Sequence, residues 1–171
     1  MARVYVSLGS NIKPEHYIKS GLADMHQQFG NLILSSIYET KAVGFDGDNF
    51  HNLVAGFDSD LKIHAIAQIL RNIEENNDRQ RTNNKFNSRT LDLDILLCDA
   101  LILKDDSLEI PRDEILKYAF VLLPLAEIAP TATHPVTGQT YAELWQNFDK
   151  NDQKLWLCSY SKSLQNKFIK S

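Results

Sequence analysis

Residues 91–97, LDLDILL, alternate between apolar and acidic side chains and then become fully apolar. Because successive side chains of a strand point to opposite faces, this pattern predicts a strand that is half exposed at its start. Leu91, Leu93 and Ile95 would point into the core, while Asp92 and Asp94 would share the other face. The elements predicted before this stretch indicate the kind of sheet to which the strand belongs.

Five predicted elements precede this strand. Strands are expected at residues 3–8, 32–40 and 50–57, which are rich in β-branched and aromatic residues. Amphipathic helices are expected at 15–29, with Pro14 near its start, and at 60–77, with Asp60 as N-cap. The order strand, helix, strand, strand, helix, strand is that of ferredoxin-like folds. We therefore predict an α+β fold, with a mainly antiparallel sheet flanked by helices in three αβα layers.

The rest of the chain shows a less regular pattern of apolar residues, and its predicted elements are short. Residues 100–103 are expected to continue the sheet, 113–118 and 141–148 to form short helices, and 154–160 to form a last strand. With 171 residues, of which 43% are hydrophobic, the chain is expected to form a single domain, 1–171. Its longest apolar run, residues 119–126, is interrupted by Pro124 and is far shorter than the roughly 20 residues of a membrane span.

Charge and cysteine content exclude further classes. The formal charge of −4 argues against a general nucleic-acid binder, which needs a basic face. The first ten residues lack the long apolar region of a secretory signal, so a cytoplasmic protein is expected. Cys98 and Cys158 form no CxxC pattern, and we predict buried free thiols.

The segment 79–94, RQRTNNKFNSRTLDLD, carries the chemistry. It places four cations just before the paired carboxylates of Asp92 and Asp94: Arg79, Arg81, Lys85 and Arg89. Two carboxylates about 7 Å apart on one strand face can converge on a divalent cation. Magnesium is bound through one or two carboxylates together with water and substrate phosphates, and arginines suit phosphate oxygens. The segment therefore predicts metal-assisted phosphate chemistry.

The ordinary alternative is a solvated strand face beside arginines that pair with Glu74, Glu75 and Asp78. The conjunction of a cationic loop with a paired-carboxylate strand favours the metal and phosphate site. The sequence has no GxxxxGK[ST], GxGxxG, HExxH or GxSxG pattern. Its scattered histidines are predicted to be surface or structural residues: His16, His26, His51, His64 and His134.

Five segments together resemble the 6-hydroxymethyl-7,8-dihydropterin pyrophosphokinase family of folate biosynthesis. They are YVSLGSN at 5–11, YET at 38–40, FHN at 50–52, SRTLDLDILL at 88–97 and FVLLPLAEIAP at 120–130. The resemblance implies magnesium-dependent transfer of pyrophosphate from ATP to the pterin hydroxymethyl group, giving AMP and the pterin diphosphate. It also implies small-molecule substrates only, no nucleic-acid or membrane partner, and a monomer.

The resemblance further implies roles for particular residues. Asp92 and Asp94 would hold two Mg²⁺ ions, and Arg81 and Arg89 would act with them on the ATP phosphates. The pterin site would comprise Thr40, Val43, Phe50, Asn52, Phe86 and Phe120. The ATP site would comprise Glu74, Arg81, Arg89, Ile95, Arg112, Lys117 and Tyr118.

Departures from the family pattern leave two alternatives open. Phe86 stands where the family usually has tryptophan, Arg112 where it has histidine, and Tyr118 where it often has arginine. These substitutions motivate a divergent, non-catalytic paralogue that still binds pterin or nucleotide. A ferredoxin-like binder of single-stranded RNA is disfavoured by the net charge and by the absence of exposed aromatic residues on adjacent strands.

Overall fold

The main sheet is antiparallel throughout its described strands. The computed structural model describes residues 1–42, 47–80 and 88–169. The strands are β1 (Ala2–Ser10), β2 (Ile33–Leu34), β3 (Tyr38–Thr40), β4 (Phe50–Ser59), β5 (Asp92–Cys98) and β8 (Trp156–Leu157). They are ordered β5-β1-β4-β3-β8, and β2 also pairs with β4. The four strands of the predicted pattern thus take the ferredoxin-like order, and the fold prediction is confirmed.

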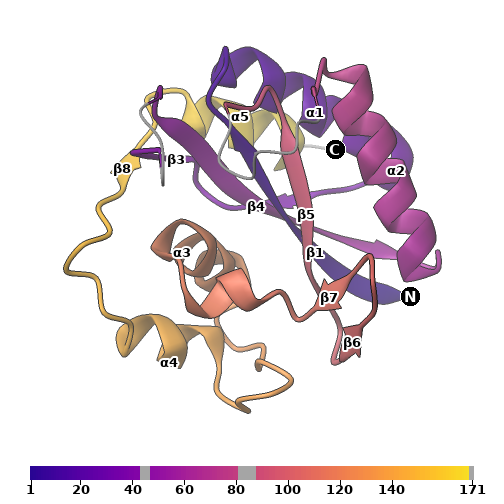
Figure 1. Ribbon diagram of the computed structural model, residues 1–171, viewed down its shortest axis with the longest axis vertical. Helices are drawn as coiled ribbons and strands as arrows, with labels where there is room; N and C mark the ends of the chain where they lie inside the picture. The colour runs from indigo at the N-terminus through magenta and orange to yellow at the C-terminus, as the bar shows by residue number, and fades with distance from the viewer. Residues whose placement is uncertain (43–46, 81–87, 170–171) are drawn as a thin grey trace.

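Helices cover both faces of this sheet. Helices α1 (Pro14–Phe29), α2 (Ile63–Asn76) and α5 (Ser161–Ile169) share one core with the sheet. The 3₁₀ helix η1 (Asp113–Leu116) and helices α3 (Ala119–Ile128) and α4 (Tyr141–Gln146) form a second core with the opposite face. In Figure 1, α3 and α4 lie at the lower left, and α1, α2 and α5 lie in the upper half. The three predicted αβα layers are therefore present.

Helix α1 ends where the sequence predicts and begins one residue earlier, at Pro14. Its apolar residues Ile18, Leu22 and Met25 are fully buried against the sheet. Gly30 has a φ of 81°, a left-handed conformation that glycine adopts without strain, and its N–H donates to the His26 carbonyl. Glycine at this position therefore ends the helix.

The predicted strand at 32–40 is interrupted, which corrects the sequence prediction. Only β2 and β3 pair with β4, and Ser35 lies between them. The Ser35 hydroxyl accepts a hydrogen bond from the Val54 N–H at 2.9 Å, so a side chain replaces one backbone bond of the ladder. Ser36 turns away toward α3, where its N–H and hydroxyl both donate to the Glu127 carboxylate. The polar pair therefore splits the strand.

Two further predictions are wrong. Asp60 is not the N-cap of α2, because the helix begins at Ile63 and Lys62 takes the capping position. Residues 100–103 do not continue the main sheet, because the chain turns at Asp99, which has a φ of 47°. Strand β6 (Leu103–Lys104) instead pairs with β7 (Glu109–Ile110) in a separate two-stranded sheet.

The sequence prediction missed α3 and α5 and overextended the last strand. Helix α3 contains the apolar run at 119–126 and includes Pro124, and its residues are buried on nearly every side. A helix buried all round shows no amphipathic period, so its pattern cannot be told from that of a buried strand. Only Trp156 and Leu157 of the predicted strand 154–160 pair with β3. Each helix in the described part of the chain is too short or too polar to span a bilayer.

Both cysteines and two of the histidines lie outside the candidate site. Cys158 is buried and Cys98 is half-buried, and both are free thiols. His64 is exposed to solvent and hydrogen-bonds to Asp105, and the half-buried His26 hydrogen-bonds to the Gly30 carbonyl. In residues 1–42, 47–80 and 88–169, no group of three or more histidine, cysteine or acidic side chains is arranged to hold a metal ion.

His134 predicts a pH-dependent component of stability. Its buried Nδ1 accepts hydrogen bonds from the Val136 and Thr137 N–H groups, both at 3.2 Å, and the nearby Tyr141 ring stays uncharged near neutrality. Burial lowers the pKa of His134, so below about pH 6.5 the unfolded chain binds a proton that the folded chain does not. The stabilising contribution of His134 is therefore complete above this pH and is lost as the pH falls toward the lowered pKa.

The measurement is urea unfolding between pH 5 and pH 8 for the natural chain and for His134→Asn, which retains an acceptor but does not titrate. The natural chain should lose up to about 1.4 kcal/mol more per pH unit below pH 6.5 than the variant. Equal slopes in the two proteins would contradict this role of His134.

Candidate active site

The strand register places the candidate residues in rows across one face of the sheet. Asp92 of β5 lies opposite Gly9 of β1, and Gly9 lies opposite Asn52 of β4. Asp94 lies opposite Ser7 in the next row on this face. Residues that lie opposite one another in a ladder share a face, so the carboxylates and Asn52 face the same side, toward α3. Residues 40 positions apart in the chain are thereby brought to one surface.

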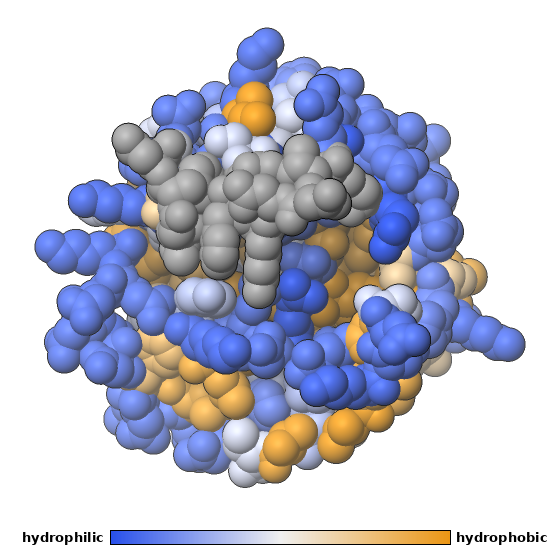
Figure 2. All heavy atoms as spheres, in the orientation of Figure 1, coloured by the Kyte–Doolittle hydropathy of each residue, from blue (hydrophilic) through white to orange (hydrophobic). Residues whose placement is uncertain are grey.

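The two carboxylates lie as the alternation predicts. Asp92 and Asp94 share the face toward α3, with side chains that are 21% and 26% exposed, and Leu93 and Ile95 are buried in the core on the other side. In the view of Figure 2, hydrophilic residues dominate the surface, and hydrophobic ones appear near the centre and at the lower edge. The pair is therefore partly buried yet accessible from solvent.

The surroundings of these carboxylates push their pKa values apart. Burial opposes the charge of Asp92, but Arg89 and Arg79 outweigh it and lower the pKa of Asp92 below its usual range. Burial and repulsion from Asp92 raise the pKa of Asp94 well above its usual range, while Arg112 opposes this rise. The Arg112 guanidinium lies 3.7 Å from the Asp94 carboxylate. The charged form of Asp94 is therefore the less compensated of the two carboxylates, and a bound cation would stabilise it.

Arg79, one of the four cations that the sequence places before the carboxylates, is a buried part of the site, although the residue roles predicted for the site did not include it. Its Nη1 donates to the Glu74 carboxylate at 3.1 Å, to the Leu91 carbonyl at 2.9 Å and to the Asp92 carboxylate at 2.9 Å. Glu74 also accepts from the Leu93 N–H at 2.9 Å, so helix α2 is joined to β5. The Arg79 side chain is only 11% exposed, so it pairs with Glu74 in a buried position and not on the solvated face that the ordinary alternative supposed. The sequence signal for this burial is Glu74, which lies among the apolar residues of α2 and therefore indicates a buried cationic partner.

Arg89 approaches the same carboxylate from the segment before β5. Its Nη1 lies 2.7 Å from the second oxygen of Asp92. The backbone of Arg89 is fixed by Asn11, whose Oδ1 accepts from the Arg89 N–H at 2.7 Å and whose own N–H donates to the Arg89 carbonyl. Asn11 is therefore a second residue that the site depends on; it belongs to the YVSLGSN segment of the family resemblance, but no role in the site was predicted for it.

The proposed pterin residues lie across β3, β4 and the start of α3. The Asn52 amide donates to the Thr40 hydroxyl at 3.2 Å, and Thr40 lies opposite Phe50 in the ladder. A Cβ at Gly9 would lie 3.0 Å from the Asn52 side-chain oxygen, so a larger residue at this position would press against this amide. Thr40 and Phe120 line one hollow of about 740 Å³. The structure therefore brings four of the six predicted pterin residues into one region.

The predicted ATP residues are distributed more widely. Arg112 lies beside Asp94 and pairs with Glu114 at 2.8 Å, and Tyr118 stacks on Phe120 with ring centroids 5.0 Å apart. Lys117 instead forms an exposed ion pair with Asp113. Ile95 is buried on the opposite face of β5, so its contact with nucleotide stays a prediction. Three other predicted residues lie outside the described part of the chain: Val43, Arg81 and Phe86.

The carboxylate pair fits a magnesium site of the kind that phosphate substrates complete. Mg²⁺ binds through one or two carboxylates and keeps its remaining positions for water and phosphate oxygens. Asp92 and Asp94 supply such a pair on one strand face, and the raised pKa of Asp94 marks the carboxylate whose charge is least compensated. The donor set therefore fits magnesium better than a metal that needs a complete protein cage.

Comparison with known proteins adds sequence relatives. The model of the family described as 7,8-dihydro-6-hydroxymethylpterin-pyrophosphokinase (HPPK) matches residues 5–130. A Porphyromonas gingivalis protein named 2-amino-4-hydroxy-6-hydroxymethyldihydropteridine pyrophosphokinase is 36% identical over 136 residues, which cover 76% of this chain and 92% of the relative. A Bacillus subtilis protein of the same name is 33% identical over 150 residues, covering 83% and 89%.

Longer proteins contain a similar region. The Dictyostelium discoideum protein named "Folic acid synthesis protein FOL1" is 34% identical over 77% of this chain, which spans only 20% of that relative. The crystal structure of wild-type Plasmodium falciparum HPPK-DHPS matches with a TM-score of 0.66 at 14% identity, covering 85% of this chain and 44% of that chain. At this identity the structural match shows a shared fold.

Proposed function

This chain belongs to the 7,8-dihydro-6-hydroxymethylpterin-pyrophosphokinase family, and we propose that it transfers pyrophosphate from ATP to 6-hydroxymethyl-7,8-dihydropterin. The hydroxymethyl oxygen forms a bond to the β-phosphorus of ATP as the bond from this phosphorus to the α,β-bridging oxygen breaks. AMP leaves, the hydroxyl proton is released, and the product is the pterin diphosphate used in folate biosynthesis. ATP is the co-substrate, and both substrates are small molecules.

The observation that carries this assignment is the row Asp92, Gly9 and Asn52. It places a carboxylate suited to metal and phosphate beside an amide suited to the edge of a heterocycle, on one face and across one intervening strand. Neighbouring strands lie about 4.8 Å apart, so two substrates bound at the ends of this row would meet. Phosphoryl transfer depends mainly on such positioning and on charge neutralisation.

Asp92 and Asp94 would hold two magnesium ions, which when bound would neutralise the charge of the triphosphate and of the transition state. Arg79 orients Asp92 through its hydrogen bonds to Asp92 and Glu74. Arg89 pairs with Asp92. Its guanidinium would also bind a phosphate oxygen, which is negatively charged like the Asp92 carboxylate. Arg81 and Arg112 would add cationic contacts to the phosphates, together with Glu74, Ile95, Lys117 and Tyr118 in the wider ATP site.

The pterin would lie between aromatic rings and a few fixed polar groups. Phe50 and Phe120 would pack on the ring, and Asn52 would hydrogen-bond to its polar edge, oriented by its own bond to Thr40. Val43 and Phe86 would complete this site. Rigid placement of the ring directs its hydroxymethyl oxygen toward the phosphates.

A second candidate function is a non-catalytic paralogue that binds pterin or nucleotide. The observation that favours it is the permanent cation of Arg112, which lies 3.7 Å from Asp94 and would compete with a metal ion for this carboxylate. Tyr118, which stacks on Phe120, also stands where the family often carries an arginine, so this position lacks a cation. The retained carboxylate pair favours the enzyme over this alternative.

The test is an assay for AMP and pterin diphosphate with ATP, Mg²⁺ and the reduced hydroxymethylpterin. We expect the two products in equal amounts, and no AMP with a pterin that lacks the hydroxymethyl oxygen. Calorimetric binding of both substrates without AMP formation would favour the paralogue. A monomeric state, a single domain over residues 1–171 and a cytoplasmic location stay predictions.

A further inference from the structure

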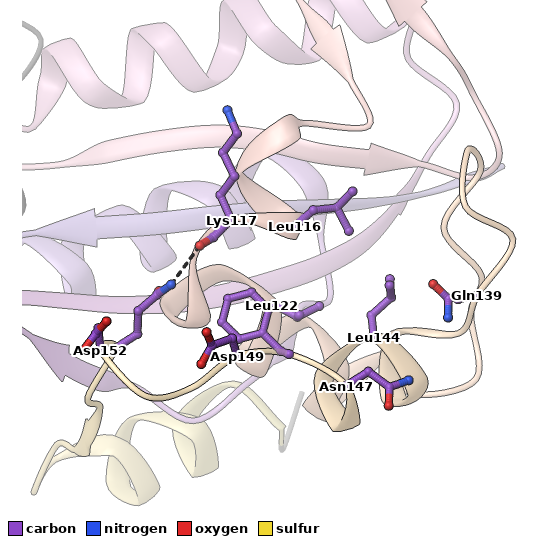
Figure 3. A pocket seen from close by; sticks show the side chains of 10 residues that line it. Leu116, Lys117, Leu122, Gln139, Leu144, Asn147, Asp149 and Asp152 are labelled. Carbon is purple, nitrogen blue, oxygen red and sulfur yellow. Dashed lines mark hydrogen bonds between the residues drawn. The ribbon is translucent and has the colours of Figure 1, made fainter.

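Gln153 joins the segment after α4 to the first turn of α3 through both ends of its side-chain amide. Its Oε1 accepts a hydrogen bond from the Ala119 N–H at 2.7 Å, and its Nε2 donates one to the Lys117 carbonyl at 2.9 Å. The second bond is the dashed line that ends on Lys117 in Figure 3. These bonds fix the residues on both sides of Tyr118, immediately before Phe120.

The start of α3 needs such a partner. The first N–H groups of a helix have no acceptor within the helix, and a side chain at the N-cap usually supplies one. Tyr118 occupies the N-cap and makes no capping hydrogen bond. Ala119 is fully buried, where an N–H without an acceptor would be costly. Gln153 therefore acts as an N-cap supplied from a distant part of the chain.

Gln153 is itself held in place. Its N–H donates to the Lys150 carbonyl at 3.3 Å. The Lys150 ammonium donates to the Trp145 carbonyl at 2.7 Å and lies 4.5 Å from the centre of the Trp145 ring. The segment that carries Gln153 is thus anchored to the end of α4, so the amide can transmit a fixed position to α3.

Gln153 lies beside the proposed pterin site. It lines the hollow of about 740 Å³ that Thr40 and Phe120 also line. It also lines a second hollow, of about 530 Å³, with Leu122 and Leu144, which Figure 3 shows. Gln153 therefore stands between the two hollows, on the side of α3 that presents Phe120.

We propose that Gln153 is a positioning residue for the pterin. By capping α3 it sets the position of the first helical turn, and thereby the distance between the Phe120 ring and the bound heterocycle. Dispersion contacts weaken steeply when a gap of even 0.5–1 Å opens, by roughly a quarter to a half. The inference rests on the proposed function, because it takes Phe120 as a wall of the pterin site.

The test compares Gln153→Met, Gln153→Glu and the control Gln139→Met. Gln153→Met keeps the length of the side chain and removes both hydrogen bonds. Gln153→Glu keeps the acceptor for Ala119 and adds a negative charge, which a helix N-terminus favours, but it loses the donor to the Lys117 carbonyl. Gln139 lines the second hollow, but its hydrogen bonds within the described part of the chain go through its backbone.

We expect Gln153→Met to raise the pterin Kd and KM about tenfold, with the KM for ATP and kcat unchanged. Gln153→Glu, which restores only the bond to Ala119, should recover part of this loss, and Gln139→Met should behave as the natural chain. Hydrogen exchange of the Ala119 amide, followed by NMR, should be faster in Gln153→Met and restored in Gln153→Glu. This readout does not depend on catalysis.

The outcomes separate the inference from the function. An active natural chain whose pterin constants do not change in Gln153→Met would overturn the inference alone. So would equal losses for ATP and pterin, which would show a general structural role. A natural chain that binds no pterin would overturn the proposed function and this inference with it.

Discussion

Replacing Asp94 by asparagine is expected to lower the rate of AMP formation by about a hundredfold to a thousandfold. Asparagine has nearly the same shape but lacks the charge that binds a divalent cation. Asp94 lies in the row next to Asp92 on the same face. In the variant, Asp92 would be the one remaining carboxylate of this pair to bind magnesium. The measurement is kcat and kcat/KM over a range of Mg²⁺ concentrations, where the variant should need more magnesium.

The same substitution should leave the fold intact. Asp94 carries a charge that burial and Asp92 both disfavour, so removing it should leave the melting temperature in magnesium-free buffer at least as high as that of the natural chain. Asp58→Asn is the matched control, because Asp58 pairs with Arg3 at the surface, where ion pairs contribute only about 0–1 kcal/mol. Full activity in Asp94→Asn, or an equal loss in Asp58→Asn, would contradict the metal-binding role.

Replacing Arg79 by methionine is expected to reduce the free energy of unfolding by about 3–5 kcal/mol and the melting temperature by roughly 10 °C. Arg79 donates to both Glu74 and Asp92, and its removal would leave two partly or fully buried carboxylates close together with less compensation. Urea and thermal unfolding measure this loss. Activity should fall as well, because Asp92 would lose one of the two cations that orient it.

A double-mutant cycle with Glu74→Gln isolates the pair. Glu74→Gln in the Arg79→Met background should recover part of the stability, because it removes one of the two uncompensated charges. Lys19→Met is the control, since Lys19 pairs with Glu15 in an exposed i,i+4 bridge and should contribute under 1 kcal/mol. If Arg79→Met were no less stable than Lys19→Met, the buried network would not support the site.

The fold was predictable wherever one face of an element is buried and the other is exposed. The alternation at Asp92 and Asp94 gave the correct strand and the correct face, because a period of two admits no other register. Helix α1 carries the corresponding helical period. Helix α3 is buried on nearly every side and therefore shows no contrast between an apolar and a polar face. The break between β2 and β3 depends on the Ser35 hydroxyl, which replaces a backbone hydrogen bond of the ladder, and composition does not indicate this.

The candidate site was predictable for residues that carry their own chemistry. The carboxylates and the loop arginines are conspicuous in the sequence, whereas Gly9, Asn11 and Gln153 act by leaving space or by fixing the backbone of another segment. Arg79 was visible as a cation, but its burial depends on the packing of α2 against β5. Pairings between segments far apart in the chain are set by the tertiary fold, so residue type alone could not indicate them.

Helix α3 is tied to the rest of the molecule at both ends, which limits how its length can change in evolution. Gln153 holds its first turn, and Glu127 near its last turn accepts hydrogen bonds from Ser36 and from the Tyr38 hydroxyl. One inserted residue between these ties would rotate one end by about 100° relative to the other. Insertions and deletions should therefore be confined to the connecting turns, while the spacing from Phe120 to Glu127 stays constant.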